Sequence, residues 1–138
     1  MGDGSDDRRS QRRQPWEIRA QVEIDTLRAM ALQATPRAHP CPDPGPWAEH
    51  LCEAEGYIAD GSSPRKWFNG TRVEGTWGHI DAAVVDMVRC VFSDEQILGM
   101  APRLRATFAR TLGPLRPERV AACAVLEQVT GDPPAEIA

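Results

Sequence analysis

The sequence has no apolar run long enough to cross a membrane, and its first 14 residues form no hydrophobic leader. A membrane-spanning helix needs about 20 apolar residues, and a leader needs an apolar centre. We therefore expect no membrane partner and a cytoplasmic location. The chain also lacks a phosphate-binding glycine loop and a dinucleotide fingerprint, so we expect no cofactor.

Cysteine is sparse and irregularly spaced, at Cys41, Cys52, Cys90 and Cys123. Without a leader, this pattern favours reduced thiols in the cytosol. His39 with Cys41, and His50 with Cys52, are residue types that bind zinc. On a helix, however, His50 and Cys52 point about 200° apart, so they cannot converge on one ion and we expect no metal.

Lysine occurs once, at Lys66, and the other fifteen basic residues are arginine. Abundant arginine, alanine, glycine and proline indicate a high-GC, bacterial genome. The chain is acidic overall, but residues 64–119 hold nine basic and six acidic residues. This basic middle suits an acidic partner, the acidic ends of the same chain, or a second copy.

The apolar pattern predicts a mainly α fold, a compact bundle of about five helical segments around a central helix at 77–92. The length, 138 residues, suits one domain. We place that single helical domain at 15–132, with a proline-rich loop at 35–46. A disordered polar and basic tail is expected at 1–14, and a short tail at 133–138.

The first predicted helix, 15–34, begins at Pro15 and is apolar on two sides. One face holds Trp16, Ala20, Ile24, Leu27, Ala31 and Ala34. The nearly opposite face holds Ile18, Val22, Ala29 and Leu32. Such a helix must be covered twice, inside the fold or by a partner. The competing prediction is a strand, because apolar and polar residues alternate over 16–24.

Local signals set the ends of the other helices. A helix at 47–55 should end at Gly56, and Thr76 should cap the central helix. Ser93 and Gln96 form a capping box for a helix that Pro102 must kink or divide near residue 101. The last helix should start at Pro117 and end before Gly131.

A short β-hairpin is predicted at about 65–74, because Asn69-Gly70 is a strong signal for a two-residue turn. Its candidate binding residues are basic or aromatic: Lys66, Trp67, Phe68 and Arg72. An outward aromatic side chain beside cations could anchor a protein interface or stack on a base.

The arginine-rich segment 103–119 is either a solvated helix face or a phosphate-binding surface, with Arg103 and Arg110 sharing one side. The segment from Leu115 to Val120, with Leu126, Gly131 and 136–138, resembles the entry to DNA-binding region 4 of sigma factors. Residues 63–70 are similar to recognition-helix segments of bacterial repressors. Neither fragment assigns the chain to a family.

No catalytic set emerges from the sequence, because His79 and Asp81 point about 200° apart on a helix and Cys90 lies nearly three turns away. We therefore expect a non-catalytic regulatory or adaptor protein, associating with another protein or itself, with a homo-oligomer favoured. Helix 16–34, with Ile18 and Val22 on its outer side, and the hairpin would carry the contact. The alternative is a nucleic-acid-binding transcriptional regulator, and a small enzyme is the least favoured.

Overall fold

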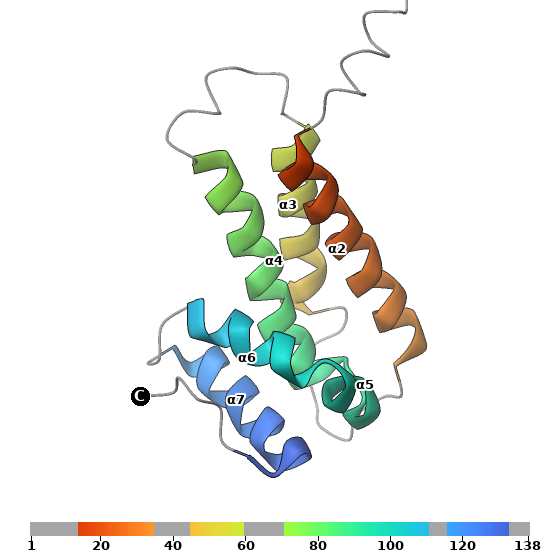
Figure 1. Cartoon of the computed structure of the whole chain (residues 1–138), viewed down its shortest axis with the longest axis vertical. Coiled ribbons are helices and arrows are strands. Elements are labelled where there is room, and N and C mark those ends of the chain that lie inside the picture. The colour runs from red at the N-terminus through yellow and green to blue at the C-terminus, as the bar shows by residue number, and fades with distance from the viewer. Residues whose placement is uncertain (1–13, 35–44, 60–70, 111–115, 133–138) are drawn as a thin grey trace, which may run out of the picture.

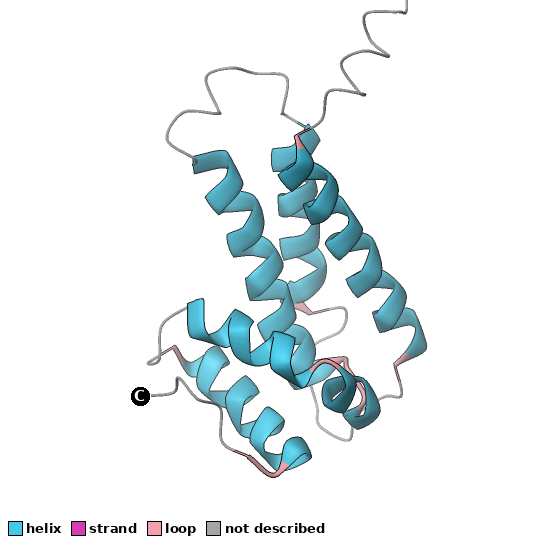
Figure 2. Ribbon diagram, viewed as in Figure 1, coloured by secondary structure: helices cyan, strands magenta, loops and turns pink. Residues whose placement is uncertain are grey.

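The computed structural model of the protein describes residues 14–34, 45–59, 71–110 and 116–132. All regular structure in these ranges is helical (Figure 2). The helices are α2 (Pro15–Gln33), α3 (Pro46–Ala59), α4 (Thr71–Cys90), α5 (Asp94–Gly99), α6 (Ala101–Arg110) and α7 (Pro117–Thr130). The predicted mainly α fold is confirmed. The predicted tails and the loop at 35–46 lie outside the described residues, except for Gln14, Gly45 and Pro46.

Helices α2, α3 and α4, which we call the long helices, run side by side, and α5, α6 and α7 gather around the C-terminal half of α4 (Figure 1). Helix α4 contacts α2, α3, α6 and α7. It is therefore the central helix, as the apolar pattern predicted. Of the predicted stripe, Ile80, Val84 and Met87 are buried, while Trp77 and Val91 are partly buried.

All six described helices contribute to one apolar core. Its buried members outside α4 are Ala20, Ile24, Leu27, Leu51, Ala54, Ile58, Phe92, Ile97, Met100, Ala101, Leu104, Phe108, Ala122, Cys123 and Leu126. Burying a leucine, isoleucine or phenylalanine side chain fully contributes about 1.5–3 kcal/mol. Among the described residues, no helix combines the length and apolar composition that crossing a bilayer requires.

The predicted hairpin is wrong in its second half. Residues 71–74 form the first turn of α4, and they cannot at the same time be a strand. Residues 65–70, including the Asn-Gly pair, lie outside the described residues. Thr76 does not cap the helix either, because it is fully buried within α4. Packing of the early turns of α4 against α3 outweighs the local turn and cap signals.

Helix α3 continues through Gly56, where the sequence predicted its end. A glycine inside a helix costs only about 1 kcal/mol relative to alanine. Beyond it, Ile58 is buried in the core, and that burial offsets the cost.

Helix α4 ends at Cys90 rather than at the predicted residue 92, whereas the local signals at the other described helix ends are confirmed. Pro15 and Pro117 each occupy the first turn of their helix. The Ser93 Oγ accepts from the Gln96 N–H at 3.2 Å, and the Gln96 side chain accepts from the Ser93 N–H at 3.0 Å. The helix divides at Met100 between α5 and α6, just before Pro102. Gly131 ends α7 with a φ of 83°, a conformation that suits glycine.

Candidate functional site

Within the part of the chain that the structure describes, the largest group of exposed apolar side chains lies on the outward side of α2. Ile18 is 53% exposed, Val22 is 57% exposed and Leu32 is 88% exposed, and Ala29 lies exposed between them. We call these four residues the outer α2 face. Ala20, Ile24 and Leu27, on the opposite side, are fully buried. The prediction of a helix that is apolar on two sides is confirmed, and the strand alternative at 16–24 is wrong.

The outer α2 face has one polar interruption. Asp25 falls between Val22 and Ala29, and its Oδ1 accepts from Gln21 Nε2 at 3.0 Å. The Thr26 hydroxyl donates to the Val22 carbonyl at 2.8 Å, within the helix. The side chains of Asp25 and Thr26 therefore both have hydrogen-bond partners inside α2, and the apolar side chains of the outer α2 face remain available to another surface.

The predicted hairpin residues give no site that can be described. Lys66, Trp67 and Phe68 lie outside the described residues. Arg72 belongs to the first turn of α4, and its side chain is outside the described part. The binding role proposed for these four residues stays a prediction.

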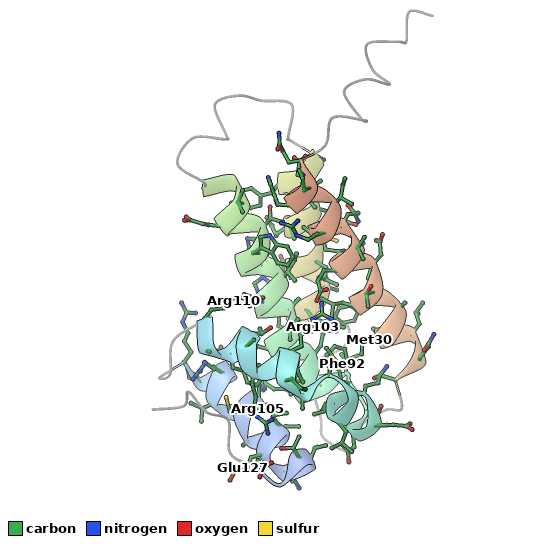
Figure 3. The ribbon with its side chains drawn as sticks, in the orientation of Figure 1. Met30, Phe92, Arg103, Arg105, Arg110 and Glu127 are labelled. Carbon is green, nitrogen blue, oxygen red and sulfur yellow. The ribbon has the colours of Figure 1, made fainter. Side chains whose placement is uncertain are left out.

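Arg103 and Arg110 lie on the side of α6 that faces the long helices (Figure 3). The Arg110 guanidinium donates twice to Asp81 of α4, at 2.9 and 3.0 Å. Asp81 is buried, so this pair ties α6 to α4. Arg103 forms an ion pair with Glu23 of α2. Both predicted phosphate-binding residues thus have carboxylate partners within the chain.

The other arginines of the segment 103–119 do not share this side. Arg119 is 2% exposed, and its Nε donates to the Phe108 carbonyl at 2.8 Å. Phe108 lies in the last turn of α6, where a carbonyl has no helical partner. Arg105 donates to the Thr130 hydroxyl at 3.3 Å. The segment is therefore not one continuous basic surface.

A pair of histidines joins α3 to α4. The Nδ1 atoms of His50 and His79 are 2.9 Å apart, and the ring centroids are 5.2 Å apart. One ring donates and the other accepts in this hydrogen bond. Tyr57 lies beside His79, with a centroid distance of 5.9 Å. Both histidines are half-buried.

Burial is the main cause that lowers the pKa of His50 below its usual value, and the neighbouring His79 adds to it. Sequence reasoning missed this pair because its members come from different helices. One partial signal was present, since His50 and Tyr57 are seven residues apart and that spacing places both side chains on the same side of a helix.

Asp86 of α4 acts as a cap for α3. Its Oδ2 accepts from the Trp47 N–H at 2.9 Å, an amide in the first turn of α3. Amides at that position have no partner in their own helix, and negative charge is favourable there. Burial raises the pKa of Asp86 above its usual value. This contact again joins helices that are distant in sequence.

The cysteines depart from the prediction of four reduced thiols. Cys90 is disulfide-bonded, while Cys52 and Cys123 are free. Cys41 lies outside the described residues. Disulfides persist mainly in oxidising compartments, so the thiols no longer support a cytoplasmic location. Cys123 is buried, and burial raises the pKa of its thiol, which fits a packing role.

The catalytic and zinc-binding groups considered from the sequence do not assemble among the described residues. His79 contacts His50, and Asp81 pairs with Arg110, so these two acid–base candidates diverge. His50 meets α4, whereas Cys52 meets Arg28 of α2. The described residues contain no cluster of three or more metal-binding side chains. Comparison with protein-family models, curated proteins and solved structures finds no match for this chain.

Proposed function

We propose that this chain is a non-catalytic regulatory or adaptor protein that associates with a protein partner through the outer α2 face. The observation that carries the proposal is the concentration of apolar surface on that face. Within the described residues, five large apolar side chains are exposed, and Ile18, Val22 and Leu32 are three of them. Contiguous exposed apolar surface commonly marks an interaction site.

A second copy of the chain is the partner we propose first. Although the middle of the sequence is basic and the remainder acidic, Arg103 and Arg110 already have carboxylate partners within the chain, so the outer α2 face is what favours contact between copies. One helix face is smaller than the roughly 800 Å² that each partner buries in a stable interface. Association through this face alone is therefore expected to be reversible and dependent on concentration.

The nucleic-acid alternative has less support. Arg103 and Arg110 would have to leave Glu23 and Asp81 before they could contact phosphates. Phosphate contacts also make affinity fall steeply with salt, whereas apolar association does not. Binding measured at two salt concentrations separates these two functions.

The test replaces Val22 with glutamate and measures oligomeric state by light scattering over a range of protein concentrations. The matched control is Leu98→Glu, because Leu98 of α5 is 55% exposed but lies off the outer α2 face. We expect the wild type to self-associate, Val22→Glu to be monomeric with unchanged stability, and Leu98→Glu to behave as the wild type. A wild type that stays monomeric at high concentration would contradict the proposal for self-association.

A further inference from the structure

We propose that His50 and His79 together bind one divalent transition-metal ion that accepts six ligands, with Ni²⁺ as the test ion. The inference is independent of the outer α2 face. It also departs from the expectation of no metal, which considered His50 only with Cys52 on its own helix.

The distance between the two rings fits such an ion. Histidine nitrogens lie about 2.0–2.1 Å from a bound metal, so two at right angles around it are about 2.9 Å apart. The Nδ1 atoms of His50 and His79 are 2.9 Å apart. Two tetrahedral ligands would be about 3.4 Å apart. The rings would only rotate so that both lone pairs meet the ion, and the helix backbones could stay in place.

The protonation state also fits. A metal ligand must be a neutral imidazole, and a hydrogen bond between two Nδ1 atoms needs at least one of them free of a proton. The ion replaces the shared proton, and the ring that donated it releases that proton or holds it on Nε2.

Three carboxylates near the pair partly offset the effect of burial, which disfavours positive charge at His50. Asp86, Glu49 and Glu53 each act electrostatically on His50 in the direction that favours positive charge. Both histidines are half-buried, so part of each residue is exposed among the described residues. Because the described residues hold no cluster of three or more ligand side chains, water would complete the coordination.

Calorimetric titration of the untagged protein with Ni²⁺ at pH 7.5, in chelator-free buffer, tests the site. We expect one Ni²⁺ per chain, with binding at least tenfold weaker in His50→Gln and in His79→Gln. The chain has three histidines, so His39→Gln is the matched control and should bind as the wild type. Cys52→Ser should also bind normally, which excludes the exposed thiol two residues from His50.

A second measurement covers the case in which a glutamine variant fails to fold. In the NMR spectrum of the wild type, substoichiometric Ni²⁺ should broaden the ring signals of His50 and His79 before that of His39. Absence of saturable binding would overturn the proposal. So would loss of binding in His39→Gln, or selective broadening at His39.

Discussion

Replacing Arg119 with alanine should destabilise the protein strongly, although the residue belongs to a segment that resembles a basic surface in sequence. Its side chain is among the largest that are fully buried. Its Nε and Nη2 both donate to the Phe108 carbonyl near the end of α6. Arg119 therefore caps α6 from the first turn of α7.

Two losses set the size of the effect. Hydrogen bonds from a charged group contribute about 1.5–3 kcal/mol, and the carbonyl left behind in Arg119→Ala would be buried without this partner. The lost side-chain methylenes contribute about 0.8 kcal/mol each. The substitution also removes a charged guanidinium from the interior, and the desolvation cost that it no longer incurs offsets part of the lost stability. We expect a net loss of about 3–5 kcal/mol in the free energy of unfolding.

Urea unfolding followed by circular dichroism at 222 nm measures this loss. Arg119→Met keeps most of the apolar stem and removes the hydrogen bonds, so it should be intermediate. Arg116→Ala is the control, since Arg116 is exposed at the N-terminus of the same helix and its side chain caps nothing. If Arg119→Ala lies within about 0.5 kcal/mol of this control, the capping argument is refuted.

Two further results are expected. A Cβ at Gly75 would lie 2.9 Å from the Tyr57 ring, whereas one at Gly78 meets nothing within 4 Å. Thermal unfolding should therefore show Gly78→Ala stabilised by about 0.5–1 kcal/mol and Gly75→Ala at least about 1 kcal/mol less stable than it. Because the pKa of His50 is lowered in the folded protein, the His50 ring takes up a proton more readily in the unfolded chain than in the folded one. The free energy of unfolding should therefore fall as pH drops below about 6.5. His50→Gln should weaken this dependence, measured as urea midpoints between pH 5 and 8, and an unchanged slope would contradict it.

Features that act within a few residues were predictable from the sequence. Proline at a first helical turn, the Ser93–Gln96 capping box and Gly131 at a helix end each satisfy backbone groups next to them. Apolar periodicity likewise identified both sides of α2, including Ile18 and Val22, because it depends only on helix geometry.

Features that depend on contacts between helices were not predictable in this way. The local signals at Gly56 and Thr76 gave wrong helix boundaries, because α3 and α4 pack together over both positions. The carboxylate partner of Arg110 is 29 residues away in sequence, and so is the partner of His50. Pairings at that distance require the arrangement of helices in space.

The position of α4 has a consequence for how the chain can be divided. Helices α2 and α3 cover one part of it, and α6 and α7 cover another, so residues 71–90 belong to both packing groups. A fragment holding only α2 and α3, or only α5 to α7, would expose the apolar surface that α4 now buries. The six described helices should therefore behave as one cooperative unit, and a fusion or truncation that separates either group from α4 would remove the partner that both groups share.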